Sequence, residues 1–245
     1  MELLAVRPHS APELAASLGV HVRTARRILK RLESEGYVTV GRNRRRRYRP
    51  TMRIVALAAQ VVERADLTKA AVRHVRALCE ALGEDCHLGV PSYLSVLCLV
   101  HASAHPARDC RPQLRELVPY CTAAGKALLA WRQPWREAVL TQTLASFTER
   151  TATGPEWLRK EAARTVARGY SIEDREFQPD SRALAAPVLS DTGDAVAALA
   201  LVAPASRLPA DRFGEFGEAV MRAAKALSED LRSDNAAPVN SRWAR

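Results

Sequence analysis

The sequence lacks long apolar runs and paired cysteines. No stretch of 18 or more residues is continuously apolar, and the N-terminus has no charged segment followed by an apolar one. These absences count against a membrane-spanning helix and a secretion signal. The five cysteines are odd in number and none forms a C-x-x-C pair, which is typical of reduced thiols rather than a disulfide framework. We therefore expect a cytoplasmic protein with no membrane partner.

Common catalytic and nucleotide-binding motifs are also missing. There is no G-x-S-x-G, no P-loop and no G-x-G-x-x-G. Four residues have spacings that loosely resemble metal ligands: Cys98, His101, His105 and Cys110. The first falls in an expected strand and the others in a loop with proline and arginine, so we expect no metal. Glu173, Asp174 and Glu176 could act as an acid and base, but surface carboxylates are far commoner. We expect no enzyme activity and no cofactor.

Positive charge is concentrated near the N-terminus. The 245-residue chain has a net charge of +10. Residues 1–50 hold 12 Lys/Arg against 4 Asp/Glu, a balance of +8, which leaves +2 for the rest. Six of the ten residues in GRNRRRRYRP (41–50) are arginine. A compact basic unit joined to a nearly neutral body is typical of a nucleic-acid-binding module attached to another domain.

The residues before this arginine run predict a helix-turn-helix. Ser10 and Glu13 have the form of a capping box, and Gly19 can end the short helix that follows. Its apolar face consists of Leu14, Ala15 and Leu18. A second helix, from near Val22 to about Glu35, carries an apolar stripe at helical spacing: Ala25, Ile28, Leu29 and Leu32. Its opposite side is basic, as in a DNA recognition helix.

The arginine run itself is predicted to lie on a β-hairpin. Residues 37–40 and 46–49 have strand character, with a turn at 41–43 between them. A hairpin beside a helix-turn-helix is a wing, and an arginine-rich wing suits phosphates or a narrow minor groove. The alternative is a solvated charge run. Residues 1–6 allow at most a stunted first helix, unless the true start lies upstream of Met1.

These elements give a set of expected DNA contacts. Arginine and threonine early in the second helix would reach base edges, while lysine and the outer arginines would hold phosphates. The predicted residues are Ser10, His21, Arg23, Thr24, Arg26, Arg27, Lys30, Arg42, Arg44, Arg45, Arg46 and Arg47. RNA is a less suitable partner, because the segment lacks the surface aromatics that stack bases. Double-stranded DNA is therefore the expected partner.

The body predicts an α+β domain. Apolar positions at helical spacing continue through 53–83, and strand and helix patterns then alternate. The expected strands are 87–90, 94–100, 170–174, 182–189 and 196–202, with turns at Pro91-Ser92 and 191–194. The expected helices are 125–131, one opened by a capping box at Thr153–Glu156 and ended by Gly169, and one over 211–231. Strands flanked by helices favour an antiparallel sheet.

Two stretches of the body resemble signatures of the IclR family of bacterial transcription regulators. YCTAAGKALLA (120–130) resembles the family's H-A-T-A-x-G-K-A-x-L-A. GYSIEDRE (169–176), followed by AAPV (185–188), resembles its G-Y-A-x-D-x-E-E … A-A-P-V. The resemblance covers residues 1 to about 232. It implies a winged helix-turn-helix (1–52), a helical linker for dimerisation (53–83) and a GAF-like effector-binding domain (84–232), with a disordered tail at 233–245. It also implies a homodimer or tetramer.

The resemblance places an effector site at the start of the 125–131 helix and the end of the 170–174 strand. Its implied residues are Ala124, Gly125, Glu173, Asp174, Ala183, Ala200 and Val202. A helix N-terminus suits an anion, and many family effectors are small organic acids. The family often has Gly and Cys where Asp180 and Ala183 stand, and Ser where Ala200 and Val202 stand. The more apolar wall predicts a larger, less polar effector than a small keto acid, or a vestigial pocket.

One reading from a different class is a small-molecule-binding protein or hydrolase that carries a basic N-terminal module. It would need a nucleophile–base pair in the body, and the sequence offers none.

Overall fold

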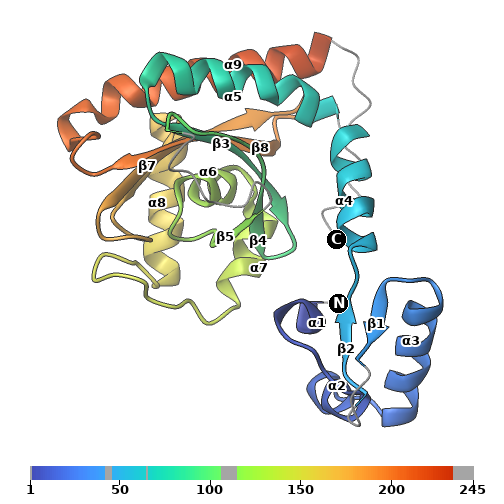
Figure 1. Ribbon diagram of the computed structural model, residues 1–245. Coiled ribbons are helices and arrows are strands. Elements are labelled where there is room, and N and C mark those ends of the chain that lie inside the picture. Colours follow the sequence, from blue (N-terminus) through green and yellow to red (C-terminus); the bar gives the residue numbers. More distant parts are fainter. Residues whose placement is uncertain (1, 42–45, 65, 106–114, 234–245) are drawn as a thin grey trace. The chain divides into compact units, whose positions relative to one another are not determined.

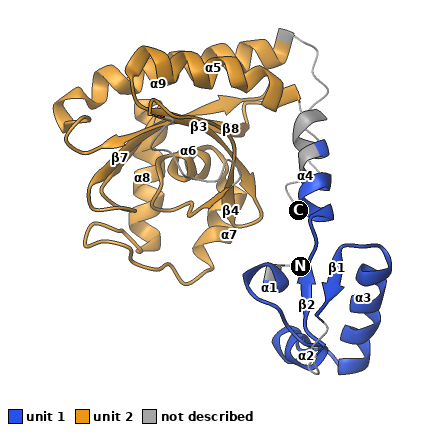
Figure 2. Ribbon diagram, in the orientation of Figure 1, with its two compact units in different colours: residues 1–64 blue, residues 65–245 orange. Residues whose placement is uncertain are grey.

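The computed structural model describes residues 2–41, 46–64, 66–105 and 115–233. The chain forms two compact units, residues 1–64 and 65–245 (Figures 1 and 2). The division falls within the segment expected to be a linker, so its first helix belongs to unit 1 and its second to unit 2. The expected disordered tail lies outside the described residues beyond residue 233.

Unit 1 contains the predicted helix-turn-helix and hairpin. Its elements are α1 (Glu2–Val6), α2 (Ala11–Leu18), α3 (Val22–Ser34), β1 (Val38–Val40), β2 (Tyr48–Pro50) and α4 (Arg53–Arg64). The two strands pair in an antiparallel manner, with Val40 opposite Tyr48. The return strand is shifted from the predicted 46–49, since Arg46 and Arg47 precede it. The first helix is the stunted one that the sequence allows.

Local signals explain the boundaries of α2. The Ser10 backbone N–H donates to Oε2 of Glu13 at 2.7 Å, and the Glu13 N–H donates to the Ser10 hydroxyl at 3.5 Å. This is the predicted capping box. Gly19 ends the helix with φ of +63°, a left-handed conformation that favours glycine. Together they set the length of α2 and the tight turn into α3.

The core of unit 1 is smaller than the sequence predicts. It joins the apolar side chains of α1, α2, α3 and the hairpin, namely Leu4, Ala11, Leu14, Leu29, Val38 and Tyr48. Ala25 and Leu29 of α3 are buried, but Ile28 is 48% exposed, and Leu18 of α2 is 55% exposed. Ile28 of the predicted apolar stripe on α3 is therefore not buried as such a stripe would be, and Leu18 of the apolar face on α2 is exposed as well. Ile28 lies at the edge of the α3 stripe, about 100° around the helix from Leu29, and the few elements of this unit do not reach that far.

Unit 2 is an α+β domain with one antiparallel sheet, as predicted. Its six strands lie in the order β5-β4-β3-β8-β7-β6. The strands are β3 (Asp85–Ser92), β4 (Ser95–Ala102), β5 (Arg115–Leu117), β6 (Ser171–Asp174), β7 (Ser181–Leu189) and β8 (Ala195–Pro204). The helices are α5 (Asp66–Leu82), α6 (Ala123–Trp131), α7 (Gln133–Leu140), α8 (Pro155–Arg168) and α9 (Phe213–Ser233), with a short 3₁₀ turn, η2 (Ala210–Arg212).

The two faces of this sheet are covered differently. Helices α5 and α9 pack on one face (Figure 1). The side chains beneath them are large and include Leu88, Leu184, Leu199 and Leu201. Helix α6 packs on the other face, against alanines of β7 and β8 at positions 183, 185, 195, 198 and 200. Small side chains let a helix lie close to a sheet. Helix α8 then packs on α6 and β6. The period-two alternation of β7 and β8 thus separates a large-residue face from a small-residue face.

Several predicted boundaries in unit 2 were wrong. The first hairpin turns at Tyr93 (φ +53°), not at Pro91-Ser92, which continue β3. Proline is tolerated there because β3 pairs with β8 only as far as Gly89. Helix α8 is capped by Gly154 with no side-chain cap, so the Thr153 capping box does not form; Pro155 sets the first helical residue instead. The short elements β5 and α7 were not predicted.

The close approach around α6 gives a test of the fold. A Cβ atom on Gly125 would lie 2.1 Å from the Pro119 carbonyl oxygen and 2.3 Å from its Cα. Backbone atoms cannot easily yield, so we expect Gly125→Ala to destabilise unit 2 by about 1–3 kcal/mol. In α9, Gly214 faces open space, and Gly214→Ala should change stability by less than about 1 kcal/mol.

Urea unfolding followed by tryptophan fluorescence measures this difference, because all four tryptophans lie within residues 65–245. Equal stability of the two alanine variants would contradict the packing described for α6.

Candidate functional site

The solvent-facing side of α3 is basic. Arg23, Arg26, Arg27 and Lys30 are exposed. Within the described part of the chain, none of their side chains has an ion-pair partner, whereas the neighbouring Arg31 is paired with Glu35 at 2.5 Å. Cations left unpaired on one side of a helix are free to meet an external polyanion. The side opposite the buried Ala25 and Leu29 therefore carries the positive charge that the sequence predicts.

Two other predicted contacts lie at the start of α3. His21 is the N-cap residue, and its Nδ1 accepts the backbone N–H of Arg23 at 3.2 Å. His21 is exposed and Thr24 is half-buried. Both residues lie in the first turn or at the cap of α3, the end that a recognition helix directs toward base edges. His21 thus has a capping role in addition to the predicted DNA contact.

The wing residues have different environments. Arg46 is exposed, but Arg47 is tied back to the unit: its Nη2 lies 2.9 Å from Oε1 of Glu13 and its Nη1 donates to the Pro8 carbonyl at 3.2 Å. Ser10 is engaged in the capping box. Three predicted residues, Arg42, Arg44 and Arg45, lie outside the described residues.

The predicted effector residues converge on the α6-facing side of the sheet. Strand register places Ala183 between Glu173 and Val202, and Ala200 between Ala185 and His87. Directly opposed residues in antiparallel strands point to the same face. Ala183 and Ala200 join the apolar cluster that includes Ala124 of α6, and Val202 packs against its edge. The structure therefore gathers Ala124, Ala183, Ala200 and Val202, with Glu173 alongside.

Asp174 does not join this group. It follows Glu173 in β6, so strand alternation sends its side chain to the other face. There it contacts three arginines, Arg182 (2.5 Å), Arg150 (2.6 Å) and Arg175 (3.2 Å). Partial burial opposes its charge, but the arginines, Arg182 above all, outweigh it and hold the pKa of Asp174 below its usual value. Asp174 is thus a structural ion-pair partner here.

The start of α6 is tightly packed. Ala124 and Gly125 are both buried, and Gly125 lies against the Pro119 backbone. The N-cap Thr122 makes no side-chain cap; its hydroxyl donates to the Val118 carbonyl at 2.6 Å instead. The backbone N–H groups expected to receive an anion are therefore at a buried helix end.

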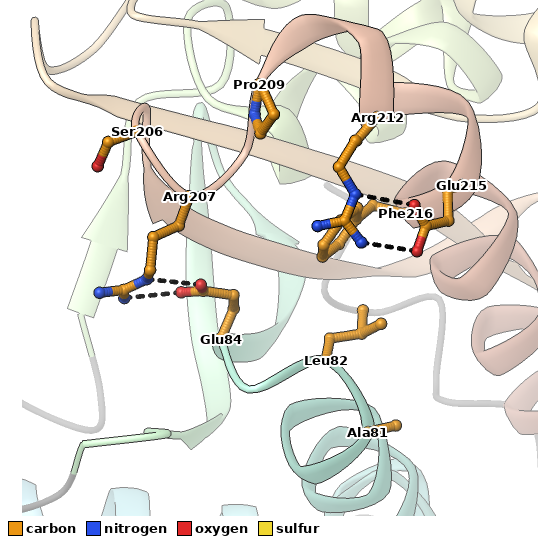
Figure 3. Close-up of a pocket in the computed structure, with 9 residues that line it drawn as sticks. All are labelled: Ala81, Leu82, Glu84, Ser206, Arg207, Pro209, Arg212, Glu215 and Phe216. Carbon is orange, nitrogen blue, oxygen red and sulfur yellow. Dashed lines mark hydrogen bonds and ion pairs between the residues drawn. The ribbon is translucent and has the colours of Figure 1, made fainter.

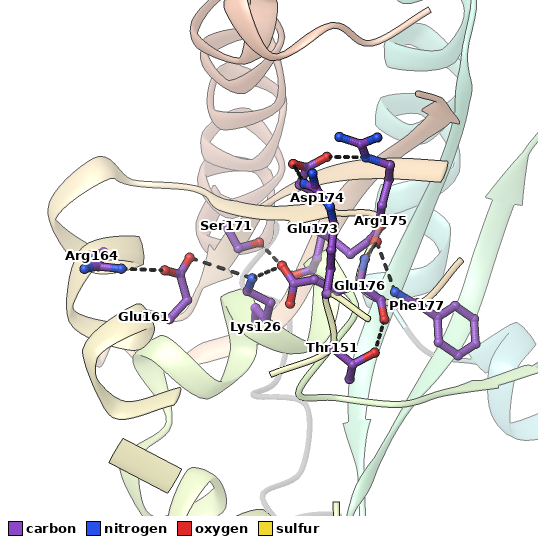
Figure 4. Close-up of polar contacts among 12 residues, drawn as sticks. Lys126, Thr151, Glu161, Arg164, Ser171, Glu173, Asp174, Arg175, Glu176 and Phe177 are labelled. Atoms are coloured by element: carbon purple, nitrogen blue, oxygen red, sulfur yellow. Dashed lines mark hydrogen bonds and ion pairs between the residues drawn. The ribbon is translucent and has the colours of Figure 1, made fainter. Parts of the chain in front are cut away.

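A buried polar cluster lies beside this helix (Figure 4). Lys126 is 4% exposed, and its Nζ lies 2.7 Å from Oε1 of Glu176 and 3.8 Å from Oε1 of Glu161. Glu173 accepts the backbone N–H groups of Glu176 (2.7 Å) and Phe177 (3.2 Å). Glu173 and Glu176 are buried, so the expectation of ordinary surface carboxylates was wrong for both.

Burial dominates the ionisation of the two glutamates. It raises the pKa of Glu173 to about 7, because removing a carboxylate from water disfavours its charged form. The backbone N–H groups of Phe177 and Glu176 act in the opposite direction but do not compensate. Burial also raises the pKa of Glu176 despite its ion pair with Lys126. This part of unit 2 therefore holds one acid, Glu173, with a pKa of about 7, and a second, Glu176, whose pKa is raised above its ordinary value.

Sequence reasoning missed several polar residues on this side of the sheet. Lys126, Glu161, Ser171 and His87 are all buried. The Ser171 hydroxyl donates to the Ala123 carbonyl at 2.7 Å, which ties β6 to the start of α6. Two features of the sequence could have predicted buried polar side chains. One is Lys126 within an otherwise apolar helix, and the other is polar residues at alternate positions of strands that are otherwise apolar.

A pocket of about 510 Å³ lies elsewhere in unit 2, between the end of α5, η2 and the start of α9 (Figure 3). Its wall includes Leu82, Pro209 and Phe216. Its charged groups neutralise one another: Arg207 pairs with Glu84 through two bonds of 2.6 and 2.8 Å, and Arg212 pairs with Glu215 at 2.9 and 2.8 Å. This pocket contains none of the predicted effector residues.

The described residues contain no group of three or more His, Cys, Asp and Glu side chains that could hold a metal ion. Cys98 and His101 lie on β4, His105 follows it, and Cys110 lies outside the described residues. Among the helices of the described residues, none is long and apolar enough to cross a membrane.

Comparisons with known proteins point to one family. The model of the bacterial transcriptional regulator IclR C-terminal domain matches residues 59–229. The HTH-type transcriptional regulator BhcR of Paracoccus denitrificans is 31% identical over 170 residues, which cover 68% of this chain and 61% of that protein. The crystal structure of a putative IclR regulator from Silicibacter sp. TM1040 has a TM-score of 0.78 and 26% identity, covering 91% of this chain and 89% of that one.

An IclR homolog from Microbacterium hydrocarbonoxydans, solved in complex with 4-hydroxybenzoate, is also similar. Its TM-score is 0.68 at 25% identity, and the match covers 92% of each chain.

The raised pKa of Glu173 predicts how stability changes with pH. Its folded-state pKa of about 7 exceeds its ordinary value of 4.5. Between these values the folded state binds more protons than the unfolded state, so stability falls as pH rises. We expect Glu173→Gln to remove part of the stability loss between about pH 5 and about pH 7.5.

Asp174→Asn is the matched control. In the wild type the pKa of Asp174 is lowered, so Asp174 titrates below this window. Asp174→Asn should therefore lose stability by a similar amount at each pH. Urea unfolding by tryptophan fluorescence gives both profiles. A Glu173→Gln profile parallel to that of the wild type would contradict the assigned ionisation.

Proposed function

The chain belongs to the IclR family of bacterial transcriptional regulators, and on this premise we propose that it reads operator DNA through α3 and the wing and responds to a small organic effector bound in unit 2. The observation that carries the DNA-binding part is the row of exposed cations on α3, opposite its buried stripe, which have no ion-pair partner among the described residues. We propose that it acts in the cytoplasm, with no membrane partner.

The proposed DNA contacts divide into two kinds. Arg23 and Thr24, in the first turn of α3, would contact base edges in the major groove. Arg26, Arg27 and Lys30 would hold phosphates along the same side, with Arg46 at the base of the wing. Phosphate contacts fix the register of the protein on the duplex, and base contacts supply the specificity.

The proposed effector would contact the α6-facing side of the sheet. Ala183, Ala200 and Val202 form an apolar stretch without hydroxyl groups, next to the Glu173 carboxyl. Helix α6 covers Ala183 and Ala200, and Val202, at the edge of this stretch, is half-buried. Such a wall favours a ligand with a substantial apolar part over a small keto acid, because an apolar wall leaves the extra polar groups of a keto acid unpaired. The structurally similar 4-hydroxybenzoate complex has a ligand of that kind.

The proposed active form is a homodimer or a tetramer. Helix α4 presents Val55 and Leu57, which are 53% and 48% exposed. Exposed apolar side chains on a helix are suited to pairing with a second copy. A two-fold arrangement of recognition helices would also match a palindromic operator.

A change at one phosphate-holding arginine tests the DNA surface. Arg27→Ala should weaken binding to operator DNA and lower the log–log salt slope by roughly 0.9, the value for one lost phosphate contact. Arg222→Ala, at an exposed residue of α9 in unit 2, should change neither quantity. Fluorescence anisotropy over a range of salt concentrations measures both. An unchanged slope for Arg27→Ala would remove this residue from the proposed interface.

A ligand screen tests the effector. We expect aromatic and other largely apolar organic acids to raise the melting temperature of the full chain and to alter its DNA affinity. Glyoxylate and pyruvate should bind weakly, because the wall lacks hydroxyl partners for them. Isothermal titration calorimetry gives the affinities. Tight binding of either keto acid would contradict the proposed ligand class.

A further inference from the structure

One arginine of the wing is joined to the start of α2. The Arg47 guanidinium contacts Oε1 of Glu13 at 2.9 Å through Nη2 and donates to the Pro8 carbonyl at 3.2 Å through Nη1. Glu13 and Pro8 lie on either side of the Ser10 cap. The Arg47 side chain thus spans from the base of the wing to the N-terminal end of α2, using two of its N–H groups.

Glu13 serves two partners with different oxygens. Its Oε2 accepts the backbone N–H of Ser10 at 2.7 Å and the Ser10 hydroxyl at 2.9 Å. Its Oε1 faces Arg47. The pKa of Glu13 lies below its usual value, first because of the Ser10 backbone hydrogen bond and also because of the Arg47 charge. One carboxylate therefore fixes both the cap of α2 and the arginine.

Backbone contacts hold the same segment from another side. His9 and Tyr48 exchange two backbone hydrogen bonds, of 3.2 and 2.8 Å. The Arg47 carbonyl accepts the Gly41 N–H at 2.9 Å, and Tyr48 is buried. The adjacent Arg46 is exposed and, among the described residues, has no acidic partner. Arg47 is therefore held by contacts within unit 1, whereas the neighbouring Arg46 side chain is exposed to solvent.

We propose that Arg47 is a positioning residue for DNA binding: paired with Glu13, it sets the direction in which the wing leaves the helix-turn-helix. This inference rests on the proposed function. The Arg47 and Glu13 side chains are 40% and 35% exposed, so the pair contributes little to folding. Its effect is geometric, because a hairpin whose base is already fixed loses less conformational freedom on binding DNA.

The two possible roles of Arg47 predict opposite effects of changing Glu13. If Arg47 contacts a phosphate, removing the Glu13 charge takes an anion away from the DNA surface and frees the arginine, so binding strengthens. If Arg47 positions the wing, the same change releases the pair and binding weakens. Glu13→Gln suits this test, because Gln also completes a capping box and keeps α2 intact.

The experiment uses fluorescence anisotropy over a range of salt concentrations, with the duplex that flanks this protein's own gene as the probe. It compares the full-length wild type with four variants. The variants are Glu13→Gln, Arg47→Ala, the two together, and Arg46→Ala. We expect Glu13→Gln and Arg47→Ala each to weaken binding about threefold to tenfold, with the salt slope unchanged and the double variant no weaker than the weaker single one. Arg46→Ala should lower the slope by roughly 0.9. Circular dichroism confirms that helix content is retained.

Tighter binding by Glu13→Gln, or a slope reduced by Arg47→Ala, would overturn the positioning role while leaving the proposed function standing. Absence of duplex binding by the wild type would overturn both.

Discussion

The burial of Ala25 and Leu29 decides where this protein displays its positive charge. These two side chains fix the rotation of α3 about its axis. With that rotation fixed, Arg23, Arg27 and Lys30 face away from the core of unit 1. The capping box before α2 and the left-handed Gly19 after it set the distance between the two helices of the motif. The wing is then held to the same frame by the His9–Tyr48 bridge and by Arg47.

Unit 2 depends on a comparable constraint, the alternation of side chains along β7 and β8. Leucines on one face receive α5 and α9, and alanines on the other allow α6 to pack closely. That close packing buries Lys126, Glu173 and Glu176 together. Removal of the two carboxylates from water disfavours their charged forms and raises the pKa values of Glu173 and Glu176. The same alternation separates Glu173 from Asp174, although the two are adjacent in sequence.

Sequence reasoning succeeded where a local signal has one physical meaning. The Ser10 box, the glycine after α2 and the helical period of α3 predicted the helix-turn-helix, and the strand patterns predicted the antiparallel sheet. It failed where tertiary partners decide. Ile28 fits the apolar stripe, yet nothing in unit 1 covers it among the described residues. Pro91-Ser92 predicted a turn, but both residues pair with β4 and continue the strand. Arg47 could not be distinguished from Arg46 in the sequence, because only the fold places Glu13 beside Arg47. The buried ion pairs of Lys126 join α6 to α8 and to the loop after β6, which are separated in sequence.

The central claim is that unit 1 reads a DNA sequence rather than only its charge. The most direct test is fluorescence anisotropy at about 150 mM salt, comparing the DNA that flanks this protein's own gene with a shuffled duplex of the same composition. The account predicts binding to the native duplex that is tighter by about tenfold or more, since base contacts from α3 add to the phosphate contacts. Equal binding to both duplexes, vanishing as salt rises, would contradict sequence reading at this site.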